Sequence, residues 1–148
     1  MKLDTFLFFD PEFHRIVNVI GPQGSGKSVF VYNVIVNVLH KKQKIMLMLF
    51  DEKPITVIDR IHKMSRLELY QIHDDLIIVD GYSQITGVTS SEKYSVNSRD
   101  LSDISIGLSK ALQNKPDIVI IDPFSSLSIH HQEQSFIMTF QIILAKLR

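Results

Sequence analysis

The sequence predicts an α/β fold in which a parallel sheet carries helices on both faces. Short apolar runs rich in β-branched residues alternate along the chain with longer segments of helical periodicity. The runs at 45–50 and 117–122 are almost wholly apolar apart from their ends, which is typical of strands covered on both faces. Strands and helices that alternate in this way favour parallel pairing with right-handed crossovers.

Length and composition agree with a single packed domain. The chain has 148 residues, of which 45% are hydrophobic and 22% charged, and its formal net charge is zero. The neutral charge weighs against a broad nucleic-acid surface. The absence of cysteine excludes disulfides and thiolate metal sites. We find no signal peptide and no apolar stretch long enough to span a bilayer, so we expect a cytoplasmic protein.

The first half of the chain predicts two strands and two helices. Residues 16–20 form a β-branched run that ends at Gly21, and residues 27–40 follow as a helix. Residues 45–50 are predicted to form the second strand. Pro54 is suited to the first position of a helix, which we expect to run to about residue 64.

The second half continues the alternation. Asp74 and Asp75 are expected to lie in a solvated turn before a strand at 76–79. A polar stretch follows at 82–98, and a loop of this length inside a domain is usually functional or mobile. We expect Asn97 or Ser98 to cap the next helix. That helix is marked by Leu101, Ile104, Leu108 and Leu112, and it precedes the strand at 117–122 and a last helix from about residue 132.

The most specific motif follows the first strand. Residues 21–28 match G-x-x-x-x-G-K-[ST] without a mismatch, and four fixed positions match by chance at roughly one site in 30,000. Glycines let successive N–H groups face inward around phosphate, and the helix that follows adds its positive end. The predicted phosphate-binding residues are Gly21, Pro22, Gln23, Gly24, Ser25, Gly26, Lys27, Ser28 and the adjacent Val29. The expected ligands are therefore ATP and Mg²⁺, with Lys27 reaching the phosphates and Ser28 the metal.

Acidic residues follow three of the predicted strands, where ligands of parallel sheets bind. Asp122 ends the fourth strand and is the stronger candidate for the Mg²⁺ side, with Asp80 at the end of the third strand the weaker. Asp51 and Glu52 follow the second strand directly. They could orient the water that attacks the γ-phosphate, or they could simply favour the N-terminus of the helix at Pro54.

Four further segments follow the phosphate loop in a recognisable order. They are FDEKP at 50–54, LIIVDGYS at 76–83, RDLSDIS at 99–105 and VIIDPFSSL at 119–127. The order of these segments resembles the KaiC-like branch of the RecA superfamily of ATPases, which has archaeal members related to RadA and to the archaellum accessory ATPase. The similarity covers nearly the whole chain, and the phosphate loop is its one highly specific motif.

This resemblance implies a RecA-like core. Lys27 and Ser28 would take the phosphate-loop roles and Asp122 the Mg²⁺-side role. The family often has two adjacent acids after the second strand, one of them the catalytic glutamate, and Asp51 and Glu52 occupy these positions. Asp51 departs from the commoner glutamate. We expect a single ATP-binding domain over residues 1–148 that lacks the last strands of the full core.

Two other sets of residues have simpler explanations. His130 and His131 are adjacent and have no evident third ligand, so we expect surface histidines instead of a metal site. Tyr82 and Tyr94 flank the polar stretch and could stack on a base, although nothing else in the sequence supports this role.

The leading hypothesis is a regulatory ATPase that binds Mg-ATP, hydrolyses it slowly and acts on a protein partner or assembles with itself as a ring or filament. The first alternative is a switch module that binds ATP without turning it over. The second is an accessory ATPase of DNA recombination or repair, against which the neutral charge weighs. A small-molecule kinase would need the stretch at 82–98 as a lid.

Overall fold

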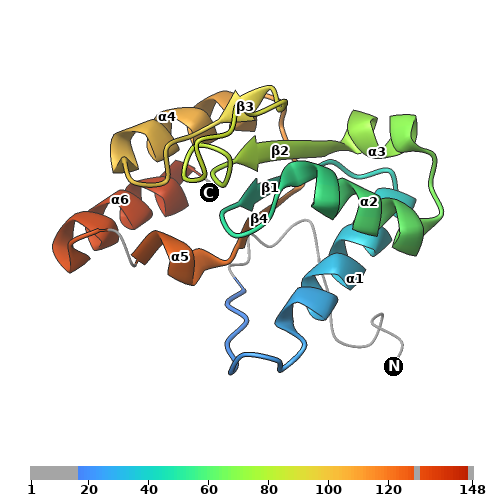
Figure 1. Ribbon diagram of the computed structural model, residues 1–148, viewed down its shortest axis with the longest axis horizontal. Helices are drawn as coiled ribbons and strands as arrows, with labels where there is room; N and C mark the ends of the chain where they lie inside the picture. The colour runs from blue at the N-terminus through green and yellow to red at the C-terminus, as the bar shows by residue number, and fades with distance from the viewer. Residues whose placement is uncertain (1–16, 129–130, 147–148) are drawn as a thin grey trace.

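The computed structural model of the chain describes residues 17–128 and 131–146 as one parallel sheet with helices on both sides (Figure 1). The sheet has four strands in the order β3-β2-β1-β4, and every neighbouring pair is parallel. The predicted α/β class, with helices on both faces, is therefore confirmed. The strands are β1 (Ile45–Leu49), β2 (Leu76–Asp80), β3 (Tyr94–Ser95) and β4 (Ile118–Asp122).

The helices agree with most of the predicted segments. The helix expected at 27–40 forms with those bounds, and the helix expected from Pro54 begins there and ends one residue beyond its predicted end. The described helices are α1 (Lys27–His40), α2 (Pro54–Ser65), α3 (Leu69–Asp75), α4 (Leu101–Leu112), α5 (Phe124–Ser128) and α6 (Glu133–Lys146).

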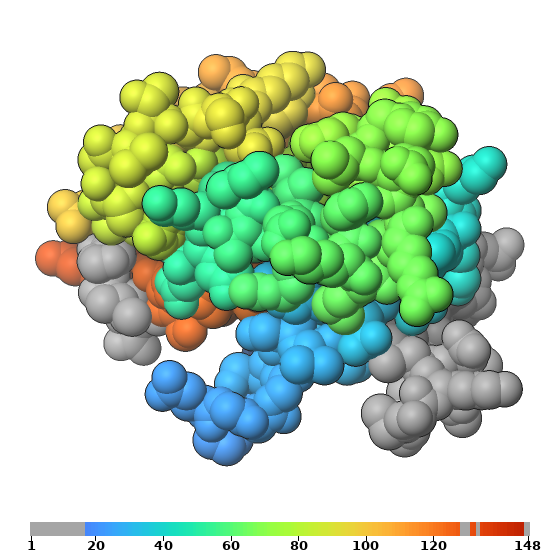
Figure 2. Space-filling view, turned by 45° about the vertical axis from the view of Figure 1, so that its right-hand side comes forward, coloured from blue at the N-terminus to red at the C-terminus, as the bar shows by residue number. Residues whose placement is uncertain are grey.

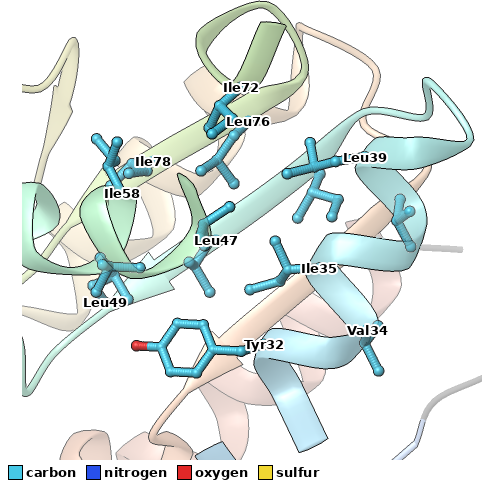
Figure 3. Close-up of a cluster of buried hydrophobic side chains, with 14 residues drawn as sticks. Tyr32, Val34, Ile35, Leu39, Leu47, Leu49, Ile58, Ile72, Leu76 and Ile78 are labelled. Carbon is cyan, nitrogen blue, oxygen red and sulfur yellow. The ribbon is translucent and has the colours of Figure 1, made fainter. Parts of the chain in front are cut away.

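One face of the sheet is covered by α1, α2 and α3. Alternate side chains of β1 point to this face, and Figure 3 shows Leu47 among the aliphatic side chains of α1 and β2. Ile35 of α1, Ile61 of α2 and Ile72 of α3 are completely buried against it. This packing fixes the start of α1, and with it the phosphate loop, relative to the ends of the strands.

The other face is covered by α4 and α6. Met46 and Met48 of β1 point to this side and are completely buried together with Leu108 of α4. Phe124 joins this layer through ring contacts with Phe136 and Phe140 of α6, at centroid distances of 5.2 and 4.6 Å. Because all five residues of β1 are buried, β1 is the central strand that both helical layers share.

The strand predicted at 16–20 does not form in the described residues, of which Ile16 is not one. Val17 to Ile20 have no regular structure and are exposed, Ile20 to 86%. A strand requires a hydrogen-bonding neighbour, and within the described residues β4 pairs only with β1. Every residue of β4 is half-buried, as expected for the edge of a sheet. The β-branched composition of 16–20 thus indicated a strand preference that no neighbouring strand satisfies here.

Three local predictions are also corrected. The cap of α4 is Asp100, not Asn97 or Ser98, because the Asp100 carboxylate accepts the N–H groups of Ser102 and Asp103. Asp74 and Asp75 end α3, which leads directly into β2, so they do not form a separate turn. Neither α3 nor α5 was predicted, since helices of seven and five residues carry too little periodicity to be recognised.

Candidate functional site

The phosphate loop depends on three glycines for two different reasons. Gly24 and Gly26 have φ angles of 79° and 86°, in the left-handed region that residues with a Cβ rarely adopt. A Cβ on Gly21 would collide with the hydroxyl of Ser25 across the loop. The motif glycines therefore allow a tight curl that other residues would strain.

The N-terminus of α1 is open to an anion. Gly26 is its N-cap and has no side chain that could accept the N–H groups of the first turn, so the cap residue leaves these groups available. Ser28 and Val29 lie in this turn and are exposed, as are Pro22, Gln23 and Ser25 of the loop. Figure 2 shows the blue loop projecting from the body of the molecule, with open space beside it.

Lys27 bridges the two ends of the loop. Its ammonium Nζ donates hydrogen bonds to the carbonyl oxygens of Gly21 at 2.6 Å and Pro22 at 2.8 Å. These contacts keep the charge of Lys27 within the loop and half-buried. A triphosphate would offer the same ammonium stronger acceptors, because hydrogen bonds between two charged groups are shorter and stronger than those to neutral carbonyls.

The sheet brings three predicted acids together at the carboxyl ends of β1 and β4, which form one edge of the sheet. β1 and β4 are neighbours with Leu49 opposite Asp122, and Asp51 and Glu52 follow β1 by two and three residues. Burial raises the pKa of Asp122, and the nearby charges of Asp51 and Glu52 raise it further, while Lys27 lowers it. Asp51, Glu52 and the phosphate-loop lysine are therefore each close enough to Asp122 to act on it electrostatically.

The two acids after β1 have different neighbours. Asp51 is exposed and accepts a hydrogen bond of 2.6 Å from the Ser126 hydroxyl of α5. Glu52 forms an ion pair of 2.9 Å with Arg60 of α2 and accepts a hydrogen bond from the hydroxyl of Tyr32 of α1. Sequence reasoning missed Ser126, Arg60 and Tyr32, because these partners lie 75, 8 and 20 residues away and no motif connects them.

Asp80, the weaker Mg²⁺ candidate, is occupied by the loop that follows it. The residue is completely buried, and its Oδ1 accepts the N–H groups of Tyr82 and Ser83 at 2.9 and 3.0 Å. Its Oδ2 accepts the hydroxyls of Ser83 and Ser90. With both oxygens engaged twice, this carboxylate organises the polar stretch after β2 and has little capacity left for a metal.

The remaining candidates lie apart from the phosphate loop. Nε2 of His131 lies 2.8 Å from the carbonyl oxygen of Ser98, and His130 falls outside the described residues. The hydroxyl of Tyr94 accepts a hydrogen bond from Asn114 on α4, and Tyr82 is half-buried at the start of its loop. Within 17–128 and 131–146, no group of three His, Cys, Asp or Glu residues could hold a metal ion.

Mg²⁺ fits the donors available at this edge. Mg²⁺ prefers oxygen ligands and is usually held by one or two protein groups together with substrate phosphates. Ser28 offers a hydroxyl and Asp122 a carboxylate. Burial raises the pKa of Asp122 most, and the charges of Asp51 and Glu52 raise it further; a cation would offset this second contribution. The small number of protein ligands agrees with a metal that arrives with the nucleotide.

We expect Asp122→Asn to stabilise the protein in the absence of Mg²⁺ and to weaken Mg-ATP binding about tenfold. Because the pKa of Asp122 is higher in the folded than in the unfolded chain, its ionised form opposes folding at neutral pH. This opposition disappears at acid pH, where the group is protonated in both states. Thermal unfolding without Mg²⁺ should show a Tm a few degrees above that of the parent at pH 7, and the difference should narrow as the pH falls.

Calorimetry with Mg-ATP provides the second half of this test. A Tm that falls at neutral pH would contradict the inferred repulsion. Unchanged Mg-ATP affinity would remove Asp122 from the metal side. Asp59→Asn is the control, because Asp59 is an exposed acid on α2. Asp117→Asn is less suitable, because Asp117 accepts a hydrogen bond from the N–H of Lys44.

Comparison with known proteins agrees with this geometry. The family described as "ATPase: KaiC" matches residues 4–148, which is nearly the whole chain. A search of curated proteins finds no match. Among the described helices, none has the length and apolar character needed to cross a bilayer. The phosphate loop, the parallel sheet and the extent of the match together place this chain in the KaiC family of P-loop ATPases.

Proposed function

We propose that this domain binds Mg-ATP on residues 21–28 and hydrolyses it slowly, as a regulatory ATPase that acts on a protein partner. The observation that supports this most directly is the electrostatic grouping of Lys27 with Asp51, Glu52 and Asp122 at one edge of the sheet. Phosphoryl transfer to water requires phosphate binding and a group that orients the water, and this edge offers residues for both.

The binding role belongs to the loop and to the start of α1. Backbone N–H groups of the loop and the uncapped first turn would surround the phosphates, and Lys27 would exchange its two carbonyl contacts for phosphate oxygens. Ser28 and Asp122 would hold Mg²⁺, which neutralises charge on the phosphates when bound. Gly21, Gly24 and Gly26 give the backbone the room to do this.

Hydrolysis itself would depend on Glu52. The oxygen of water bonds to the γ-phosphorus while the bond from that phosphorus to the bridging oxygen breaks, which yields ADP and phosphate. Glu52 would accept a hydrogen bond from this water and take up its proton as the new bond forms.

A regulatory role agrees with the surface beside the phosphate loop. Val17, Val19, Ile20 and Val29 flank the loop on both sides and are 40–86% exposed. Exposed apolar side chains that precede and follow a ligand loop in the sequence are suited to contact with another protein or another copy of this chain, as in a ring or filament. Binding or release of nucleotide at the same loop would then change the strength of that protein contact.

Phosphate release from Mg-ATP by the parent chain and by Glu52→Gln tests the proposal. We expect slow turnover by the parent and a loss of about 100-fold in Glu52→Gln, since a positioned proton acceptor typically contributes about 10²–10⁴-fold. Asp59→Asn is the matched control, because Asp59 is an exposed acid of α2 whose ion pair, within residues 17–128 and 131–146, is with Lys63. Turnover that survives in Glu52→Gln would contradict the assigned role of Glu52.

The alternative of an ATP-binding switch without turnover is favoured by one observation. Both oxygens of Glu52 are already hydrogen-bonded to Arg60, so the carboxylate is not free in this conformation. Absence of phosphate release, together with intact ATP binding, would support this alternative. Salt-sensitive binding of DNA in the same preparations would support an accessory role in recombination or repair.

A further inference from the structure

The carboxylate of Glu52 lies between side chains from two different helices. Nη1 of Arg60, from the middle of α2, donates to Oε2 at 2.9 Å and to Oε1 at 3.2 Å. The hydroxyl of Tyr32, from the second turn of α1, donates to Oε2 at 3.3 Å. Three hydrogen-bond contacts therefore determine where this carboxylate points.

Arg60 and Tyr32 also hold one another. Nη1 of Arg60 donates to the Tyr32 hydroxyl at 2.5 Å, and the guanidinium carbon lies 4.8 Å from the centre of the Tyr32 ring. Tyr32 is only 6% exposed and belongs to the core shown in Figure 3. Burial and the charge of Glu52 raise the pKa of Tyr32 to about 12, so its hydroxyl remains a donor at neutral pH. The Tyr32 side chain is therefore anchored in the core, and its hydroxyl reaches Glu52.

This arrangement leaves Glu52 able to bind water. An ionised carboxylate has about four acceptor positions, and the three contacts leave one of them unused. The Glu52 side chain is 42% exposed, so solvent reaches it. A carboxylate whose direction is fixed and which retains one acceptor position is suited to hold one water in one orientation.

We propose that Arg60 and Tyr32 are positioning residues that fix Glu52 for the attacking water. This inference rests on the proposed function, since it assigns a purpose to the contacts of the proposed water-orienting group. Tyr32 lies five residues after Lys27 on the same helix. The helix that would receive the phosphates thus also sets the direction of Glu52, which links nucleotide binding to the geometry of hydrolysis.

The direction of the Glu52 carboxylate can decide the rate of hydrolysis. In some P-loop enzymes a neutral amide suffices to orient the water, so the direction of the group matters more than its proton affinity. Misplacement of a reacting group by about 1 Å can lower a rate by about 100-fold. An ion pair that holds the orientation of Glu52 can therefore increase turnover.

Arg60→Met and Tyr32→Phe test the proposal, because both retain the packing of the side chain and remove its donors. We expect kcat to fall about tenfold in Arg60→Met and about threefold in Tyr32→Phe, with KM and Mg-ATP affinity unchanged. Arg60→Lys, which retains the charge, should recover part of the loss. Lys63→Met is the matched control, since Lys63 lies on the same helix and, in the part of the chain that the structure describes, pairs with the exposed Asp59 and not with Glu52.

The Glu52→Gln background separates this inference from the proposed function. If the residues act through Glu52, Arg60→Met should lower turnover no further in that background. Loss of turnover in Glu52→Gln but full turnover in Arg60→Met and Tyr32→Phe would overturn the positioning role alone. Faster turnover in Arg60→Met would also overturn it, because the ion pair would then restrain Glu52. If Arg60→Met fails to fold, Tyr32→Phe and Arg60→Lys provide the test, since a positioning role predicts that kcat falls while KM is unchanged.

Discussion

Lys27→Ala lowers the affinity for Mg-ATP by about 1,000-fold, because two hydrogen bonds to charged groups at about 1.5–3 kcal/mol each are lost. In the free protein the Lys27 ammonium already lies inside the loop, on the carbonyls of Gly21 and Pro22. It therefore needs little rearrangement to meet phosphate, and no other lysine occupies the loop. Isothermal titration calorimetry with Mg-ATP measures the effect directly.

The control for this experiment is Lys41→Ala. Lys41 is exposed just beyond the other end of α1, so its removal changes the net charge equally and leaves the loop intact. We expect parent-like affinity in this variant. Undiminished binding of Mg-ATP by Lys27→Ala would contradict the central proposal that the loop is the nucleotide site.

Asp80→Ala destabilises the fold by about 3–5 kcal/mol, because each buried polar group left without a partner costs about 1–3 kcal/mol. The substitution removes the acceptor of two backbone N–H groups and two serine hydroxyls while leaving the donors in a site from which water is largely excluded. The hydroxyls can turn to other acceptors, but the backbone donors of Tyr82 and Ser83 cannot. Urea unfolding of the parent and variant gives the difference in free energy.

Asp80→Asn distinguishes this structural role from a metal role. The amide retains one acceptor oxygen, so we expect a smaller loss of stability and parent-like affinity for Mg-ATP. A metal ligand would behave in the opposite way, with reduced Mg-ATP affinity even where the fold is intact. Stability equal to that of the parent in Asp80→Ala would show that the loop after β2 does not depend on this carboxylate.

The elements that were predicted correctly are those whose signal lies within a short stretch of chain. The bounds of α1 follow from the glycine before Lys27 and the lysines after His40, and α2 begins where Pro54 favours a first helical position. β1 was recognisable because a strand buried on both faces reads as continuous apolar sequence. These signals depend on neighbouring residues alone.

The predicted strand at 16–20 failed for the opposite reason. A strand is completed by a partner that can lie anywhere in the sequence, and apolar β-branched residues cannot reveal whether one is present. The same limit applies to β3, two residues within a polar stretch whose pairing with β2 is visible only in the fold. The cap of α4 was missed by two residues, because several polar residues before it could each have served.

The sequence was sufficient to predict a phosphate loop, because the roles expected of Gly24, Gly26 and Lys27 depend on backbone geometry and charge within eight consecutive residues. It also identified acids at strand ends and favoured Asp122 over Asp80, but it did not give the contacts of either carboxylate. The three-dimensional structure separated Asp80, whose oxygens are used by its own loop, from Asp122, which lies in the field of Asp51, Glu52 and Lys27.

The contacts of Glu52 with Arg60 and Tyr32 required the packing of α1 against α2. Side chains 20 and 8 residues away from Glu52 meet only after both helices are placed on one face of the sheet. The geometry of a short motif depends on consecutive residues, whereas contacts between distant residues depend on how buried surfaces pack together. That difference explains why the nucleotide loop was evident from the chain and the surroundings of Glu52 were not.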